Sequence, residues 1–490
     1  MWISYGRREA SRPAIEAAPL RAVLAAVDRW SAPLAIAVLF AYPNPLVPVA
    51  LGVLALHAAR LLARRLAGVG ATPLDAGFAL LAVGSLVGFV VAHHREAAQL
   101  RLTGIVAAVA LFYVVVGSLS HERAVRRASW AILAAVVVGM VVLLALLRGS
   151  LPDSTVSRAI WPLLAPFSLF PGVSGDTLDV NTRFAVHQYG LAHLLLVAGA
   201  FAAGAAAVGP GRVRSAGLVA LLAIVPFLLA TQSRGAILAL AVAATVVATF
   251  RHWLALSLLP AVGGLFYALL ARGTISRGVE GEWLSDRLSY WTGTFSMLGD
   301  FPLTGVGLGM RSFAEAYAWY QRLPTPYLVS HTHNIFLQAY AEQGLLGMVG
   351  LIGLAIAGVA IGLRATRRTL SPDRWLVAGA TGAVLGSFLY GLTDQVPSTN
   401  LSLALVFALL AVLVAADRLA ASGQGHPVER APRRAESRAP AILPSSARGR
   451  LVAALLGVVV VAGGAMIAPR WISGLFLNAG SSELLAVVLD

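Results

Sequence analysis

Long apolar stretches alternate with short polar connections along most of the chain. Each stretch has about the 17–25 residues that a helix needs to cross a bilayer. This pattern predicts an all-α, polytopic membrane protein with about twelve transmembrane helices, followed by a thirteenth near the C-terminus. The twelve predicted spans are 24–42, 44–60, 73–92, 102–120, 128–147, 185–209, 214–231, 235–250, 253–271, 335–363, 375–394 and 399–417, and the thirteenth is 450–469.

The composition agrees with a membrane protein. Hydrophobic residues make up 58% of the 490 residues and charged residues only 12%, compared with about 25% charged residues in a soluble domain. The mean hydropathy is +0.79. There are no cysteines, which excludes disulfide bonds, thiolate catalysis and cysteine-ligated metal.

The arginines predict the orientation of the spans. All 37 basic residues are arginine, and the net charge is +15. In a soluble protein such a charge would suggest nucleic acid as a partner, but in a membrane protein arginine-rich loops favour the cytoplasmic side. We therefore expect membrane lipids and no nucleic acid as partners. The loops predicted to be cytoplasmic are 60–65, 123–127, 212–214, 251, 364–374 and 418–450.

Three polar segments are predicted to lie on the outer side: 148–184, 231–234 and 272–334. Residues 1–418 form one predicted transmembrane domain, with 230–420 as its core. Ala, Pro, Arg and Ser dominate 419–449, which indicates a disordered cytoplasmic linker. Residues 450–490 are predicted to form an extra transmembrane helix and a short outer tail.

The long outer loop 272–334 carries an amphipathic pattern and a glycine-rich turn. Apolar residues at helical spacing from Trp283 to Leu298 predict a helix at the membrane interface. Arg287 lies beside this apolar stripe, where it faces either a lipid headgroup or a bound anion. The Gly-x-Gly-x-Gly run at 305–309 follows no strand, so we interpret it as a turn rather than a dinucleotide site. Such a turn either presents N–H groups to an anion or only permits tight turns of the backbone.

Three arginines mark the outer ends of spans or the outer loop: Arg234, in the very short connection 231–234, Arg183 and Arg287. An arginine near the interface can simply extend toward water. The planar guanidinium group also donates two parallel hydrogen bonds to a phosphate and stays charged. Together the three arginines predict a diphosphate site at the headgroup level.

His333 ends the same outer loop, just before an apolar run that begins at Ile335. A histidine has an unperturbed pKa near 6.5, which suits a general base for an incoming hydroxyl group. Beyond it, Gly344, Gly347, Gly350 and Gly353 recur every third residue and predict a groove into which another helix packs.

A metal site is the competing interpretation of the histidines. His331 and His333 could act as two ligands, and Glu280 and Glu282 could supply carboxylates. Zinc takes three or four protein ligands, and no third ligand stands at a motif spacing. We therefore expect a mechanism without metal or other cofactor.

These residues resemble a known family. His333-Asn334, nine residues and Gly344-Leu345-Leu346-Gly347 match the His-(Asn/Ser/Gln)-x9-Gly-x-x-Gly pattern of the bacterial O-antigen ligases, the WaaL family, within the O-antigen ligase/Wzy polymerase superfamily. Ser233-Arg234-Gly235 resembles the Ser-Arg-Gly element of that superfamily, and 287–310 resembles the signature that precedes its histidine. The resemblance covers about 230–420 strongly.

The resemblance implies a glycosyltransferase with GT-C-type architecture that uses neither a nucleotide sugar nor a metal. It would transfer a glycan from undecaprenyl diphosphate to a hydroxyl acceptor, foremost lipid A-core in lipopolysaccharide biosynthesis, at the periplasmic face of the inner membrane. His333 would activate the acceptor, Arg234 and Arg287 would bind the diphosphate, and Arg183, His331 and Asn334 would assist. The implied stereochemistry is inversion, and we expect a monomer.

Other functions stay open at this point. The same fold and motifs serve Wzy-type O-antigen or exopolysaccharide polymerases and protein O-oligosaccharyltransferases, which differ in their acceptors. A lipid-linked glycan exporter or an anion transporter is an alternative of another class. It would place charged residues in the middle of spans, whereas here the middles are nearly free of charge.

Overall fold

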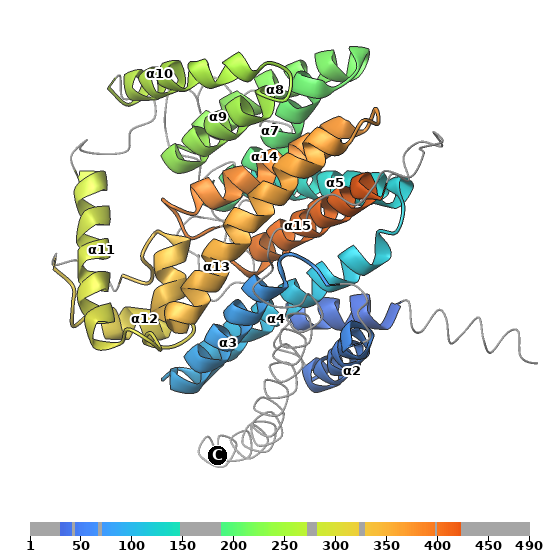
Figure 1. The fold of residues 1–490 in the computed structure, drawn as a ribbon. Helices are drawn as coiled ribbons and strands as arrows, with labels where there is room; N and C mark the ends of the chain where they lie inside the picture. The colour runs from blue at the N-terminus through green and yellow to red at the C-terminus, as the bar shows by residue number, and fades with distance from the viewer. Residues whose placement is uncertain are drawn as a thin grey trace, which may run out of the picture.

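The computed structural model describes residues 30–41, 45–66, 71–147, 188–271, 282–322, 329–396 and 399–422. Within these ranges the regular elements are helices, and no strand occurs (Figure 1). A short first helix, Trp30–Phe40, precedes the labelled ones. The labelled helices are α2 (Val47–Leu66), α3 (Asp75–Val91), α4 (Arg95–Ser118), α5 (Glu122–Leu147), α7 (Gln188–Val208), α8 (Gly211–Ala230), α9 (Arg234–Ala248), η3 (Trp253–Leu258), α10 (Leu259–Ala271), α11 (Glu282–Asp300), α12 (Met310–Tyr317), α13 (Ile335–Arg368), α14 (Arg374–Tyr390) and α15 (Asn400–Ala421).

These helices confirm an all-α, polytopic membrane protein. Among the described residues, six helices are long and apolar enough to cross a membrane: α4, α5, α7, α8, α13 and α15. Further apolar helices are shorter, including α3 and α9. The count of twelve or thirteen spans stays a prediction. α15 continues to Ala421, and the rest of the predicted linker and the span at 450–469 lie outside the described residues.

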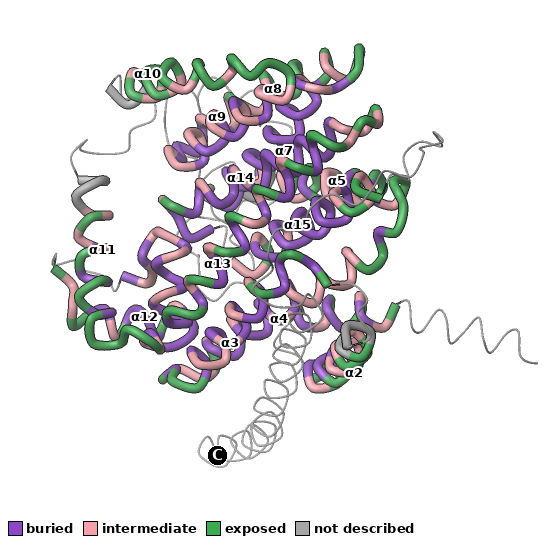
Figure 2. The backbone as a smooth tube through the Cα atoms, in the orientation of Figure 1, coloured by how far each residue is buried: buried purple, intermediate pink, exposed green. Residues whose placement is uncertain are grey.

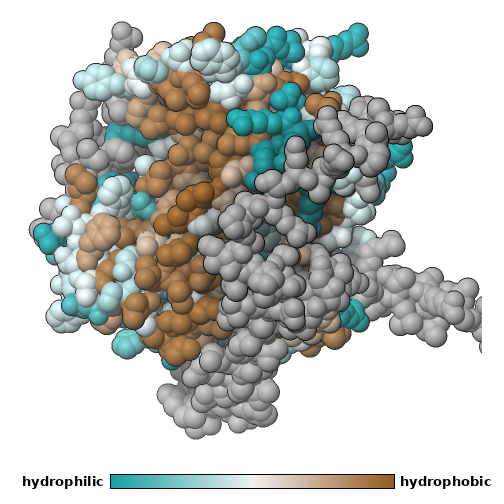
Figure 3. Space-filling model, viewed as in Figure 1, coloured by the Kyte–Doolittle hydropathy of each residue, from teal (hydrophilic) through white to brown (hydrophobic). Residues whose placement is uncertain are grey.

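The core lies where α7, α14 and α15 pack together with α3, α4 and α13. Nearly every side chain of α14 is buried, as are those from Val406 to Ala416 in α15 (Figure 2). Helices α5 and α8 expose large apolar side chains such as Val138 and Leu222. One face of the molecule shows a broad apolar band with hydrophilic residues toward its edges, as expected for a surface in contact with lipid (Figure 3).

Helices α3 and α13 approach each other closely through glycines. A Cβ atom added to Gly84, Gly347 or Gly350 would overlap neighbouring atoms. At Gly84 and Gly350 these neighbouring atoms belong to the backbone of the facing helix. This confirms the predicted groove at Gly347 and Gly350. Gly353 has open space around its Cβ position, so it takes no part in this contact.

Gly344 breaks α13 into two parts. Its backbone angles are φ 68° and ψ −170°, which lie outside the helical region. The glycine-rich turn fills the break: Val306 N donates to Ala341 O at 2.8 Å, and Leu345 N donates to Leu303 O at 3.3 Å. Leu308 N also donates within the protein, to Gly88 O at 2.8 Å. Of the two interpretations of the turn, the structure therefore supports the one in which the glycines permit tight turns, since Gly305, Gly307 and Gly309 all have positive φ.

Replacing Gly344 with alanine should destabilise the protein by about 2–4 kcal/mol, because it adds strain at positive φ and a Cβ that overlaps Leu303 O. The thermal unfolding midpoint of the detergent-solubilised protein measures this effect. Gly353→Ala is the matched control on the same helix and should be neutral or stabilising by up to about 1 kcal/mol. Equal midpoints for the two variants would contradict this account of the break.

The arginine-rich ends of the helices gather on one side. Asp417 pairs with Arg364 at 3.0 Å and with Arg368 at 3.2 Å, and Arg126 pairs with Asp373 at 3.3 Å. The part of α13 beyond the break, Leu345–Arg368, alone extends about 36 Å at 1.5 Å per residue. The start of α13, next to His333, therefore lies far from these ion pairs. The predicted candidate residues and the arginine-rich loops occupy opposite ends of the helices.

Candidate functional site

The start of α13 is anchored to the loop that follows α14. Ile335 N donates to Gly391 O at 2.7 Å, and Asn334 Nδ2 donates to Leu392 O at 3.2 Å. Asn334 Oδ1 accepts hydrogen bonds from Phe336 N and Leu337 N, which makes Asn334 the N-cap of α13. Asn334 therefore fixes where the helix begins and where His333 lies.

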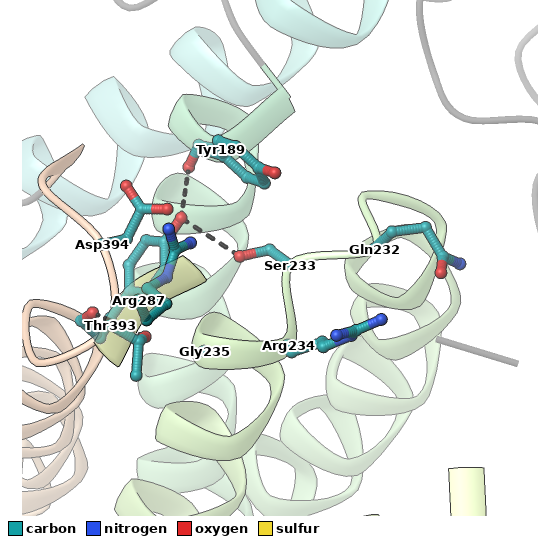
Figure 4. Close-up of a pocket in the computed structure, with 9 residues that line it drawn as sticks. Tyr189, Gln232, Ser233, Arg234, Gly235, Arg287, Thr393 and Asp394 are labelled. Carbon is teal, nitrogen blue, oxygen red and sulfur yellow. Dashed lines mark hydrogen bonds between the residues drawn. The ribbon is translucent and has the colours of Figure 1, made fainter. Parts of the chain in front are cut away.

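A small cavity opens beside this anchor, where the starts of α7 and α9, the end of α14 and the helix α11 meet (Figure 4). Its volume is about 120 Å³. Pockets that enclose drug-sized ligands measure roughly 300–1,000 Å³. The cavity thus has room for a small group only. It is lined by Tyr189, Gln232, Ser233, Arg234, Gly235, Arg287, Tyr390, Thr393 and Asp394.

The Ser-Arg-Gly segment forms one wall of the cavity. Ser233 Oγ donates to the Tyr390 hydroxyl at 3.2 Å, and that hydroxyl donates to Tyr189 O at 3.4 Å (Figure 4). Gly235 lies so close to Thr393 that a Cβ atom would overlap Oγ1 of that residue. The serine and the glycine therefore have packing roles, and Arg234 between them is one of the residues that line the cavity.

Arg287 enters the cavity from α11 and lies near Asp394. Burial lowers the pKa of the Arg287 guanidinium group, and the Asp394 carboxylate opposes this shift. Burial raises the pKa of Asp394, and Arg287 opposes that shift in turn. Arginine stays protonated in proteins. In Figure 4 the side chain of Arg234 extends away from Arg287, toward the side of Gln232, so the two arginines line the cavity at different places.

His333 lies next to this cavity rather than in its wall. Its ring stacks on Tyr290 with centroids 5.8 Å apart, and the His331 ring is 4.0 Å away. The side chain is partly buried, and its Nδ1 is buried without a hydrogen-bond partner. Burial lowers the pKa of His333 well below its usual range, and His331 and Arg287 add to this effect. The imidazole is therefore neutral near pH 7 and available as a base.

The backbone holds His333 in an uncommon conformation. Its φ is 55°, and Gln232 in the facing cavity wall has a φ of 54°. Residues other than glycine rarely adopt this left-handed region, and such strain often occurs at functional sites. Thr332 just before it is fixed on both sides: its N–H donates to Gln338 Oε1 at 2.9 Å, and its carbonyl accepts from Trp291 Nε1 at 2.9 Å.

The structure thus brings most of the predicted site residues together. Arg234 and Arg287 line one cavity, and His331, His333 and Asn334 form the adjoining loop. Arg183 and Glu280 lie outside the described residues, and Glu282 is the first residue of α11. In the parts of the chain that the structure describes, no three His, Asp or Glu side chains form a cluster that could hold a metal ion.

Sequence reasoning did not identify Asp394 as a site residue. Asp394 directly follows an apolar run and lies in a loop without arginines. An isolated carboxylate in that position was the sequence signal that could have marked it as a site residue. The Glu342–Arg101 ion pair was also not predicted, although Glu342 lies inside the predicted span 335–363. A carboxylate in an apolar run is itself a signal for a buried partner. Tyr189 and Tyr390 gave no sequence signal that separates them from other tyrosines at span ends.

Comparison with known proteins gives one family match. Residues 218–352 match the family model described as O-antigen ligase. The matched segment contains Arg234, Arg287 and His333, and it ends before Asp394. No curated protein matches the chain. This match supports a relation of residues 218–352 to the O-antigen ligase and Wzy polymerase superfamily.

Proposed function

We propose that this protein is a metal-independent, inverting glycosyltransferase that transfers a glycan from undecaprenyl diphosphate to a hydroxyl acceptor. The observation that carries the proposal is the cavity lined by Arg234 and Arg287 directly beside a partly buried, neutral His333. The family match at 218–352 supports a membrane enzyme that ligates or polymerises glycans.

The diphosphate of the donor would occupy the cavity. The two arginines that line the cavity at different places offer planar hydrogen-bond donors for phosphate oxygens. At about 120 Å³ the cavity holds a phosphate-sized group, and the lipid and glycan parts of the donor would lie outside it. Arg183, which the structure does not describe, is proposed as a further cation for the same group.

His333 would act as the general base. As the acceptor oxygen attacks the anomeric carbon, its proton passes to the imidazole, and the bond between that carbon and the diphosphate oxygen breaks. The charge that develops on the leaving diphosphate is stabilised by Arg234 and Arg287. With the base on the acceptor side and the leaving group opposite, the anomeric configuration inverts.

The preferred acceptor is lipid A-core, which makes the reaction O-antigen ligation at the periplasmic face of the inner membrane. We further propose that 1–418 forms the catalytic transmembrane domain with a GT-C-type architecture, 419–449 a linker and 450–490 an accessory membrane segment. A Wzy-type polymerase or a protein O-oligosaccharyltransferase differs from this proposal only in the acceptor. A transporter would share the phosphate site and release no diphosphate.

The test is release of undecaprenyl diphosphate by the purified full-length protein in detergent, with a chelator present throughout. We expect release that requires an acceptor, and the acceptor that works separates ligase from polymerase. An α-linked donor should give a β-linked product. Release that stops on chelation would restore the metal interpretation. A protein that binds donor without any release would support transport.

A further inference from the structure

We propose that Arg101, Glu342 and Gln338 form a positioning chain that holds the His333 loop in its working conformation. This inference rests on the proposed function of His333 as the base. The three residues come from α4 and α13, and none of them lines the cavity. They would act through the backbone at Thr332 rather than on the substrate.

The chain begins with a buried ion pair. Arg101 Nε donates to Glu342 Oε2 at 3.2 Å, and the side chains are 14% and 0% exposed. A charged side chain inside an apolar helix is costly unless it is paired, and such residues commonly mark functional positions. Gly344, where α13 breaks, lies two residues beyond Glu342. Glu342 therefore lies in the short part of α13 between His333 and the break at Gly344.

The second link is Gln338. Its Nε2 donates to Glu342 Oε1 at 3.0 Å, so both carboxylate oxygens of Glu342 are used. This bond turns the Gln338 amide so that its Oε1 faces the loop, where it accepts from Thr332 N at 2.9 Å. Gln338 is buried, with 1% of its surface exposed. The Arg101–Glu342 ion pair thereby orients the Gln338 amide, which accepts a hydrogen bond from the backbone just before His333.

The third link is the strained backbone itself. His333 has a φ of 55°, a conformation that persists only where its surroundings impose it. Trp291 binds the carbonyl of Thr332 from the other side, so Gln338 and Trp291 hold the same residue from opposite elements. Without Gln338 the Thr332 N–H would be buried without that partner, and the loop would relax.

The far end of the chain is fixed to the helical core. Arg101 Nη1 donates to Asn400 Oδ1 at 3.5 Å, and Asn400 Nδ2 donates to Leu100 O at 3.2 Å. These contacts tie α4 to the start of α15, a helix that is largely buried. The positioning chain therefore connects the His333 loop with the rigid interior of the protein.

Two buried glutamines on the same part of α13 give a matched test. Gln338→Leu removes the bond to Thr332. Gln343→Leu replaces a glutamine that is 2% exposed and whose Oε1 has no hydrogen-bond partner. We expect Gln338→Leu to lower kcat by about 10–100-fold with little change in the KM for donor, since small misplacements of a reacting group have effects of this size. Gln343→Leu should keep kcat within about twofold, because it leaves the chain of bonds to Thr332 in place.

The pH profile separates positioning from general damage. His331 from the same loop and Arg287 and Tyr290 from α11 face His333. These groups stay in the Gln338→Leu variant. A relaxed loop exposes the imidazole and moves it away from Arg287, and both changes weaken the causes that lower its pKa. The pKa of His333 should then rise toward its usual value. In the pH profile of activity, the acid limb should therefore move to higher pH. A purely structural defect lowers the amount of folded enzyme without moving this limb.

The outcomes are distinct. Loss of kcat in Gln338→Leu with a shifted acid limb, and unchanged kcat in Gln343→Leu, would support the positioning chain. Equal kcat values for wild type and both variants would overturn it, provided that His333→Ala is inactive. If His333→Ala keeps its activity, the proposed function itself fails. Thermal unfolding midpoints of both glutamine variants establish that the compared proteins are folded.

Discussion

Replacing His333 with alanine should lower the rate of glycan transfer by about 10²–10⁴-fold, which is the usual contribution of a general base. The structure gives two reasons. The imidazole is neutral because burial lowers its pKa, and it stands beside the two arginines that would hold the leaving diphosphate. The measurement is acceptor-dependent release of undecaprenyl diphosphate under saturating donor, so that kcat is compared directly.

The matched control is His121→Ala. His121 is an exposed histidine between α4 and α5, near the arginine-rich ends of the helices, and its loss should leave kcat unchanged. The wild-type profile adds a second check: because the pKa of His333 is depressed, the acid limb should lie below pH 6.5, and activity should fall only as the pH drops through the folded-state pKa. Full activity of His333→Ala would remove the histidine from the mechanism.

Replacing Arg287 with alanine should lower kcat/KM by about 10²–10³-fold, as expected when a group that stabilises developing charge is lost. This substitution also removes the cation next to the buried Asp394. A buried carboxylate without its partner is destabilising, here by up to about 3 kcal/mol. The variant therefore loses both activity and stability, and the two effects need separate measurements.

A double variant separates them. In Arg287→Ala/Asp394→Asn the unpaired charge is gone, so the unfolding midpoint should recover while kcat/KM stays low. Arg311→Ala is the matched control for an outer arginine, because Arg311 is 69% exposed and pairs with Glu315 at the surface. Recovery of kcat/KM in the double variant would show that Arg287 contributes through stability alone.

The sequence predicted the helices well but not their ends. The predicted span 102–120 corresponds to α4, which starts earlier, at Arg95, and the predicted span 335–363 corresponds to α13, which continues to Arg368. Hydropathy marks the residues that prefer lipid, whereas a helix continues through polar turns at the interface. Arg101 therefore falls just outside the predicted span, although it lies in the second turn of α4 and faces the protein interior.

The candidate site was predictable where the signal is local. The spacing from His333 to Gly347 and the Ser-Arg-Gly segment could be read from the chain, and Arg287 stood out beside an apolar stripe. The partners that distant segments supply gave no such signal. Asp394 reaches Arg287 only because α14 ends beside α11, and Glu342 meets Arg101 across nearly half of the chain. Such pairings depend on the packing of whole helices.

The size of the cavity bears on which donors the protein would tolerate. On the proposed function, a space of about 120 Å³ lined by arginines recognises the phosphate part that every lipid-diphosphate donor shares. Sugars attached to that group extend beyond the cavity walls, so this part of the site would not distinguish one glycan sequence from another. The donor site would then accept donors that carry different sugars. Any selectivity between acceptors would have to come from surfaces around His333.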